Sequence, residues 1–158
     1  MDGVGRQPVQ VLVMPYAVAP GHVSYGVLRR ADGGQWQGVA GGADGVETPL
    51  EAATRETGEE LGLVGAEFRV LDARASVPAD CFAGWERWLT LDPPVYVVPE
   101  HAFAVLVPDP HRIVLSREHD AILWLPYGDA RRLLTWDSNR TALWELRQRL
   151  LADGVDGA

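Results

Sequence analysis

The sequence predicts a single α/β domain, and three observations support this. The chain has 158 residues with 47% hydrophobic and 23% charged content, which is typical of one globular domain with its own core. Apolar runs of strand length alternate with segments of helical periodicity. Neither an internal repeat nor a linker-like stretch divides the sequence. We therefore expect one domain over residues 1–158, with its core at about 8–151 and a loose tail at 152–158.

The first half of the chain begins with strands. Val9–Ala19 and Val23–Arg30 have strand-like patterns, and Pro20-Gly21 between them is a turn signal. A glycine-containing loop follows, and the short apolar stretch from Trp36 to Ala40 comes next. Glycine then recurs ahead of a helix, which predicts a flexible loop between the two elements.

That helix has the clearest boundaries in the sequence. Thr48 is suited to the N-cap, Pro49 to the first helical position and Glu51 to the third, which together form a capping box. Gly62 follows Leu61 and is a good C-terminal glycine. The pattern predicts a helix that runs to about Leu61.

The second half predicts more strands and two closing helices. In the last helix, apolar side chains at helical spacing indicate a stripe that packs on the core: Leu143, Trp144, Leu146, Leu150 and Leu151. The predicted strands are Glu67–Ala75, Arg87–Leu91, His101–Val107, Ile113–Leu115 as the hairpin partner of His101–Val107, and Ala121–Leu125, and the helices are Asp129–Leu134 and Ser138–Leu151.

Charge and cysteine content exclude several functions. With 14 basic and 22 acidic residues the net charge is -8, which argues against a nucleic-acid duplex or an anionic membrane as partner. An acidic protein can still bind phosphates where a metal ion supplies positive charge. The single cysteine, Cys81, cannot form an intrachain disulfide, and the four histidines show no catalytic signature around it. No apolar run is long enough to span a membrane, and the single cysteine fits a reducing cytosol, so we expect a cytoplasmic protein.

The candidate chemistry lies in the Thr48–Leu61 helix. Glu56, Glu59 and Glu60 are spaced i, i+3 and i+4, so the three carboxylates share one helical face. Like charges at this spacing repel, and a divalent cation such as Mg²⁺ would relieve the repulsion. The alternative is an ordinary solvated acidic face.

The surrounding spacing favours the metal site. Seven fixed positions of the segment GGADGVETPLEAATRETGEELGL resemble the Nudix box without a gap, and Thr57 at an aliphatic position is a mild departure: Gly41, Glu47, Arg55, Glu56, Glu59, Glu60 and Gly62. At roughly 7% usage per residue type, such a match occurs by chance about once in 10⁸ starts. The resemblance implies the Nudix fold, a mixed curved β-sheet sandwiched between helices.

The resemblance also implies roles at the matching positions. Nudix enzymes hold Mg²⁺ or Mn²⁺ against a diphosphate that water attacks. Glu56 and Glu60 match metal ligands, and Glu59 matches a further ligand or a group that positions water. Gly41 matches the glycine whose carbonyl approaches the metal. Glu47, Arg55 and Gly62 match structural positions of the box, although Arg55 also stands four residues after Glu51, at the spacing of a helix ion pair.

Flanking segments narrow the resemblance to one group. The bacterial dihydroneopterin triphosphate pyrophosphatases are similar at four places: Arg29-Arg30, Trp36–Gly41, Glu118-His119 with Trp124-Leu125, and Trp136–Arg140. Two departures are Ala40 in place of a threonine at the substrate loop, and Val46 in place of the glycine before Glu47.

Several residues outside the box have two interpretations each. Glu118 is either a metal ligand or general base, or a surface carboxylate. Arg29 either binds the phosphate chain or is solvated, and Trp36 either stacks on a base or pterin or is structural. Ala40 and Ser138 are expected to contact substrate, although Ser138 with Asn139 also suits a helix cap. Arg6 and Gln10 could border the pocket, and residues 76–87, with Phe82 and Trp85, are expected to set substrate selectivity.

The expected activity is metal-dependent cleavage of a nucleoside triphosphate-like substrate, either dihydroneopterin triphosphate or a (d)NTP, to a monophosphate and pyrophosphate. The alternatives are a diadenosine polyphosphate hydrolase, an enzyme that removes oxidised nucleotides, and a non-catalytic nucleotide-binding regulator. Dimers are common in the resembled family, and the sequence shows no interface signature.

Overall fold

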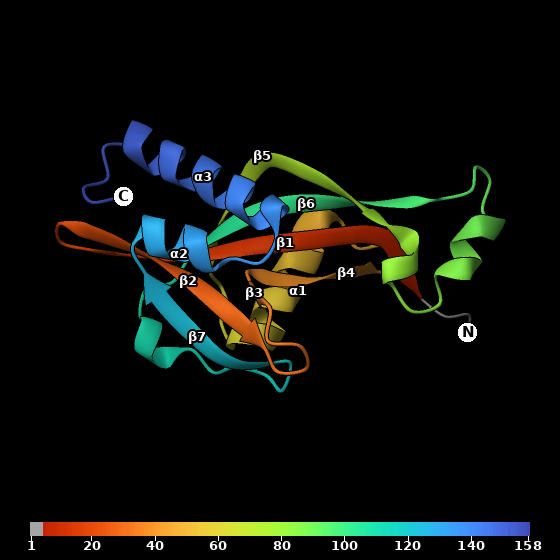
Figure 1. Ribbon diagram of the computed structural model, residues 1–158, viewed down its shortest axis with the longest axis horizontal. Helices are drawn as coiled ribbons and strands as arrows, with labels where there is room; N and C mark the ends of the chain where they lie inside the picture. Colours follow the sequence, from red (N-terminus) through yellow and green to blue (C-terminus); the bar gives the residue numbers. More distant parts are fainter. Residues whose placement is uncertain (1–4) are drawn as a thin grey trace.

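The long strand β1 (Arg6–Ala19) lies at the centre of a seven-stranded mixed sheet in a computed structural model that describes residues 5–158 (Figure 1). The strand order is β3-β2-β1-β6-β5, while β4 pairs with β1 and β7 pairs with β2. The remaining strands are β2 (His22–Arg30), β3 (Trp36–Gln37), β4 (Val39–Asp44), β5 (Glu67–Pro78), β6 (Val97–Leu106) and β7 (His119–Leu125).

One edge of β1 has two partners, and this division positions the site. Its first half pairs with β4 and its last residues pair with β2, both antiparallel. The other edge pairs with β6, and this is a parallel ladder in which Gln10 stands opposite Glu100. Residues from β4, β1 and β6 therefore lie side by side at one end of the sheet.

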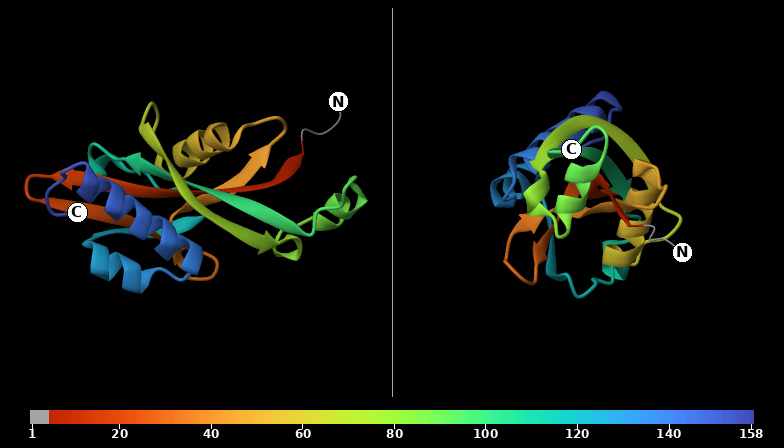
Figure 2. Two further views of the ribbon diagram at one scale, coloured as in Figure 1. Left: turned by 90° about the horizontal axis from the view of Figure 1, so that it is seen from above. Right: turned by 90° about the vertical axis from the view of Figure 1, so that its right-hand side faces the viewer.

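Helices cover both faces of the sheet, as the resemblance implied. α1 (Pro49–Leu61) packs on one face, and α2 (Tyr127–Leu133) and α3 (Asp137–Ala152) pack on the other (Figure 2). Successive side chains of a strand point to opposite faces, so β1 contributes to both cores. Val11 and Val13 join the α1 core, and Leu12 and Met14 join the α2–α3 core.

The boundaries of α1 confirm the sequence signals. Thr48 Oγ1 accepts a hydrogen bond from the backbone N–H of Glu51, and the Glu51 carboxylate accepts one from the backbone N–H of Thr48. Gly62 ends the helix in the left-handed conformation with φ 67°, which glycine adopts without a steric cost. The helix ends are thus fixed by local chemistry, and so is the junction between α1 and the segment that precedes it (residues 41–48, the motif loop).

The prediction of a strand at Arg87–Leu91 was wrong. This segment belongs to a 3₁₀ helix, Trp85–Thr90, which begins after Gly84 at φ 73°. Trp85 and Trp88 are three residues apart, the period of a 3₁₀ turn, and both contribute to a small cluster with Ala79 and Val98. A second short 3₁₀ helix, Ala79–Cys81, precedes it.

The predicted hairpin partner Ile113–Leu115 was also wrong. Both edges of β6 are occupied, by β1 and by β5, so no edge remains for a third strand. The segment instead follows the 3₁₀ helix Pro110–Arg112 and caps α1. The N–H of Val114 donates to the carbonyl of Leu61, and the N–H of Ser116 donates to the carbonyl of Glu60.

Two expectations for the C-terminus need correction. In α3, Leu143, Leu146 and Leu150 are buried, but Trp144 and Leu151 are 54% and 46% exposed, so the buried stripe is narrower than predicted. The tail is not loose. The N–H of Val155 donates to the carbonyl of Leu150, the carbonyl of Gly157 accepts from Val23, and Val155 and Ala158 pack on the α2–α3 core. Across residues 5–158, the helices are all too short or too polar to cross a membrane.

Candidate active site

A cavity of about 630 Å³ opens where β1, β4 and β6 lie together, between α1 and the start of α3. Segments far apart in the sequence line it. The lining residues are Arg6, Gln10, Leu12, Arg30, Gln37, Ala40, Gly41, Gly42, Glu56, Val77, Cys81, Phe82, Glu100, Glu118, Trp136, Ser138 and Asn139.

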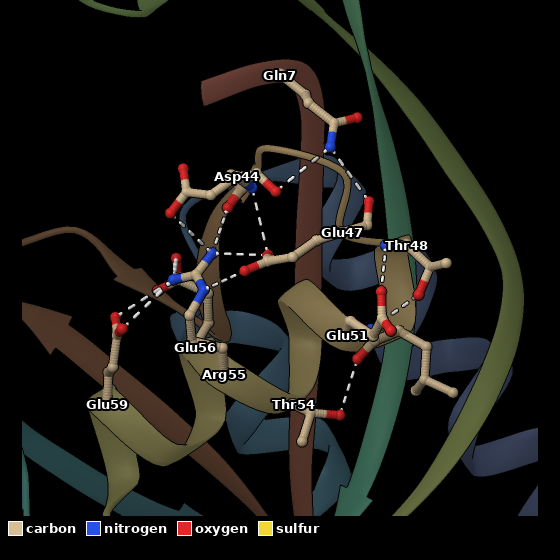
Figure 3. Close-up of polar contacts among 11 residues, drawn as sticks. Gln7, Asp44, Glu47, Thr48, Glu51, Thr54, Arg55, Glu56 and Glu59 are labelled. Atoms are coloured by element: carbon tan, nitrogen blue, oxygen red, sulfur yellow. Dashed lines mark hydrogen bonds and ion pairs between the residues drawn. The ribbon is translucent and has the colours of Figure 1, made fainter. Parts of the chain in front are cut away.

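Arg55 fixes the motif loop against α1 (Figure 3). Its Nε and Nη2 atoms donate to the two oxygens of Glu47 at 2.8 and 3.1 Å, and Nη2 also donates to the carbonyl of Gly42 at 2.8 Å. These bonds raise the pKa of Arg55 and lower that of Glu47. The expected pairing of Arg55 with Glu51 is not what forms, because the Glu51 carboxylate caps the helix.

Glu56 is directed into the cavity by the same arginine. Arg55 Nη1 donates to Glu56 Oε1 at 2.9 Å, and the side chain of Glu56 is only 12% exposed. It lies directly against Gly41, where an added Cβ would be 2.1 Å from Glu56 Cδ. Burial raises the pKa of Glu56, although Arg55 opposes the shift.

Glu60 is the most unusual group of the site. It is 1% exposed, and both carboxylate oxygens lack a hydrogen-bond partner among the described residues. Burial raises its pKa to about 9, and the charges of Glu56 and Glu118 add to the shift. A buried carboxylate without a partner is costly, so its presence indicates that a cation belongs beside it.

Glu118 and His119 complete this corner. One ligand atom from each of Glu60, Glu118 and His119 lies within 4.8 Å of the others. Oxygen ligands from carboxylates suit Mg²⁺ and Mn²⁺, and a neutral imidazole also suits Mn²⁺. The residues present therefore fit a divalent cation.

His119 is a neutral ring in this corner. Burial and the charge of Arg30 lower its pKa, so it is uncharged at neutral pH. Its Nδ1 is 3.7 Å from Glu60 Oε2, too far for a hydrogen bond, and both ring nitrogens lack partners among residues 5–158. His119 was not among the site residues expected from the sequence. The signal was its position directly after Glu118.

Glu59 lies beside Glu56 and shares a nitrogen of Arg55 with it. Its side chain is 59% exposed, and it contacts Arg55 Nη1 at 3.4 Å, the nitrogen that also bonds to Glu56 (Figure 3). It does not line the cavity. The structure thus brings Glu56, Glu60 and Glu118 toward one region, and Glu59 lies at its exposed side next to Glu56.

Two arginines bring positive charge to the cavity wall. The pKa of Arg6 is lowered chiefly by burial, and the charges of Glu56 and Asp44 act against this shift. Arg30 donates two hydrogen bonds of 2.9 Å to Asp32, and the nearby negative charge of Glu118 helps to raise its pKa. Arg6 lies near Glu56 and Arg30 lies near Glu118. This arrangement suits a polyphosphate that bridges the two arginines.

The substrate-binding residues expected from the sequence divide into two groups. Ala40 and Ser138 line the cavity, as do Arg6 and Gln10. Arg29 and Trp36 do not. Arg29 donates to Asp120 at 2.6 Å on the opposite side of β2 from Arg30, and it lies over the Trp36 ring at 5.6 Å.

Trp36 has a structural position. It packs against the α2–α3 core, and its backbone N–H donates to Thr135 Oγ1. An aromatic residue that does line the cavity is Trp136, whose Nε1 donates to Gln37 Oε1 at 3.1 Å. Phe82 and Cys81 also line it, so part of segment 76–87 does face the cavity.

Comparison with known proteins agrees with this geometry. The sequence model of the NUDIX domain matches residues 22–145. The dihydroneopterin triphosphate diphosphatase of Escherichia coli K12 is 32% identical over 144 residues, which cover 90% of this chain and 93% of that enzyme. The chain therefore belongs to the Nudix family and is a hydrolase.

Solved structures support the same assignment. A protein from Listeria monocytogenes assigned as a NUDIX hydrolase has a TM-score of 0.81 and 38% identity, covering 96% of this chain and all (100%) of that one. The E. coli dihydroneopterin triphosphate pyrophosphohydrolase has a TM-score of 0.70 and 27% identity, and the match covers 90% of this chain and 98% of that enzyme. The α/β/α Nudix fold expected from the sequence is thus confirmed.

Proposed function

We propose that this chain is a metal-dependent pyrophosphohydrolase that cleaves a nucleoside triphosphate-like substrate to a monophosphate and pyrophosphate. The observation that carries the proposal is the buried, unpartnered carboxylate of Glu60, which adjoins Glu56 and Glu118 at a cavity with two arginines. The relation to the E. coli dihydroneopterin triphosphate diphosphatase favours dihydroneopterin triphosphate as substrate, and a (d)NTP with the same triphosphate chain is the alternative.

Glu56, Glu60 and Glu118, together with the carbonyl of Gly41, would hold Mg²⁺ or Mn²⁺. A bound divalent cation supplies positive charge to the diphosphate and makes water more acidic. The charges of Glu56 and Glu118 disfavour ionisation of Glu60, and a positive ion would reverse this effect. Without such an ion, an anionic substrate would be repelled by this corner.

The remaining groups have roles that follow from their positions. Arg6 and Arg30 bind phosphate oxygens, because each guanidinium stands on the cavity wall beside the carboxylates. Glu118 is the candidate general base, since it is the exposed carboxylate of the cluster and can accept a proton from water. Arg29 and Trp36 have no direct role in this proposal, because Arg29 pairs with Asp120 and Trp36 packs against the α2–α3 core. Glu59, which lies beside Glu56 at Arg55, is a candidate further ligand.

The test is a substrate panel with product analysis. Purified protein is assayed with dihydroneopterin triphosphate, dATP, dCTP, dGTP, oxidised dGTP and dinucleoside polyphosphates, each with Mg²⁺, with Mn²⁺ and with excess EDTA. We expect turnover that requires added metal, with pyrophosphate and a monophosphate as the first products. Full turnover in EDTA would exclude the metal role, and orthophosphate as the sole first product would exclude this class of hydrolase.

A further inference from the structure

Glu100 is a buried carboxylate in the cavity that the metal site does not use. It lies on β6, is 8% exposed and lines the cavity on the face of the sheet opposite α1. Among residues 5–158 no basic side chain forms an ion pair with it. Burial raises its pKa, and the Ser138 hydroxyl opposes this shift. A carboxylate that lines a cavity in this way can accept hydrogen bonds from a ligand with N–H donors.

Gln10 stands beside Glu100 on the neighbouring strand. The two residues are opposite each other in the parallel β1–β6 ladder, so their side chains leave the same face about 5 Å apart. Arg6 donates to Gln10 Oε1, which assigns the oxygen of that amide to the arginine. The amide nitrogen Nε2 is then the end of Gln10 available to a ligand. The pair therefore presents a carboxylate acceptor next to an amide donor.

Other polar groups near the pair are already engaged. Asn139 accepts from the N–H of Gly38 at 2.9 Å and donates to Ser138 Oγ at 3.2 Å. The oxygen of Gln37 accepts from Trp136. These bonds hold the cavity wall in place, and Phe82 and Trp136 add flat aromatic surface to it.

We propose that Glu100 and Gln10 recognise the edge of the substrate's heterocycle and select rings with a 2-amino-4-oxo pyrimidine edge, the edge shared by guanine and pterins. This edge offers two adjacent N–H donors to the carboxylate and a carbonyl to the Gln10 amide. Two N–H donors also stabilise the ionised form of Glu100 when the ligand is bound. The inference rests on the proposed function, because it assumes that the heterocycle enters the same cavity.

The same pair disfavours other rings. Adenine and cytosine present a ring-nitrogen acceptor beside their amino group, and this lone pair would face a carboxylate oxygen. A mismatched donor–acceptor pair that leaves buried polar groups unpaired is strongly disfavoured. We therefore expect wild-type protein to prefer dGTP and dihydroneopterin triphosphate over dATP and dCTP.

The test is Glu100→Gln, which keeps the size of the side chain but replaces one acceptor with a donor. We expect kcat/KM for dGTP to fall by roughly 10- to 100-fold, the value of one good bidentate contact, while that for dATP falls less than threefold or rises. Glu67→Gln on the exposed end of β5 is the matched control and should leave the ratio of dGTP to dATP unchanged.

A binding measurement separates this inference from the proposed function. Calorimetric titration with the α,β-methylene analogues of dGTP and dATP should show the same change of preference in Glu100→Gln without any turnover. If hydrolysis proceeds as proposed but the ratio of dGTP to dATP is unchanged in the variant, the inference is wrong and the proposed function stands. Equal losses for both nucleotides would show that Glu100 only supports Ser138 and the fold.

A second variant covers the case in which Glu100→Gln does not fold. Gln10→Leu removes the amide donor and leaves Glu100 in place. We expect it to lower the affinity for the dGTP analogue and to affect the dATP analogue less. Unchanged affinity for both analogues would overturn the proposed recognition.

Discussion

Gly41 and Glu56 are in such close contact that a methyl group at position 41 would lie 2.1 Å from Glu56 Cδ. Carbon atoms do not approach to this distance, so Gly41→Ala must displace the Glu56 carboxylate. Because Glu56 is also bonded to Arg55, the displacement should disturb the whole motif corner. We expect kcat to fall by at least tenfold, while the midpoint of urea unfolding stays close to that of the wild type.

Gly58→Ala in α1 is the control for this substitution. An added Cβ there meets only the carbonyl of Leu63, at 3.8 Å. Alanine in a helix interior is more stable than glycine by up to about 1 kcal/mol, so this variant should be equally or more stable and fully active. Normal kinetics in Gly41→Ala would show that the position of Glu56 is not required.

Arg55→Lys tests the contact between loop and helix. Lysine retains the charge but cannot bond to both oxygens of Glu47 and to the Gly42 carbonyl at once. We expect a loss of about 1–3 kcal/mol in the free energy of unfolding, measured with urea, and a lower kcat. Arg112→Lys, at a side chain that is 87% exposed, should change neither quantity. Equal stability of both variants would mean that the Arg55 contacts contribute little.

The parts of the fold that the sequence predicts well depend on local chemistry. The boundaries of α1 follow from Thr48, Pro49 and Gly62, which act within one turn of the helix ends. The 3₁₀ helix at Trp85–Thr90 was missed because Arg87–Leu91 is a short, partly apolar run, and such a run is compatible with either a strand or a helical turn. Ile113–Leu115 was misassigned because its apolar pattern does not reveal that both edges of β6 are occupied.

The site shows the same division. The spacing of Glu56 and Glu60 places them on one helix, so their association is evident from the sequence. Arg29 and Arg30 must point to opposite faces of a strand, but only the structure tells which face carries the cavity. Glu100 reaches the cavity through a parallel ladder between strands about 90 residues apart, and no local pattern indicates that pairing.

The pKa of Glu60 predicts how stability depends on pH. Burial raises this pKa from 4.5 to about 9, so at intermediate pH the folded chain binds a proton that the unfolded chain has released. Stability of the metal-free protein should therefore fall as pH rises from 7 to 9, by at most about 1.4 kcal/mol per pH unit from this group. His119 does not contribute to the change in stability between pH 7 and 9. Its pKa is lowered from 6.5, so its effect on stability lies below about pH 6.5.

Urea unfolding in EDTA at pH 7, 8 and 9 measures this slope. Glu60→Gln cannot titrate, so its stability should change less over the same window, and the difference between the two slopes isolates Glu60. Added Mg²⁺ should stabilise the wild type more at pH 9 than at pH 7, because ionised Glu60 is the form that binds a cation. Identical slopes for the wild type and the variant would show that Glu60 is ionised throughout.

Glu60→Gln also tests the metal site through turnover. The substitution keeps the size of the side chain and removes the negative charge of Glu60. Because this position is buried, water cannot replace the lost anionic oxygen as a ligand of the cation. We expect kcat to fall by a factor on the order of 10²–10³, the usual cost of removing one electrostatic stabiliser. Stability without metal should stay level or rise at pH 8, because a buried carboxylate beside Glu56 and Glu118 is removed.

Glu51→Gln on the same helix is the control for this loss. Glu51 accepts the backbone N–H of Thr48 at 2.7 Å and does not line the cavity, and a glutamine oxygen can accept the same bond. The variant should lose at most a few tenths of a kcal/mol in stability and keep its kcat. Calorimetric titration of both variants with Mn²⁺ should show weakened Mn²⁺ binding only for Glu60→Gln. Comparable losses of activity in the two variants would mean that the helix carboxylates serve the fold, and the assignment of Glu60 as a metal ligand would then be withdrawn.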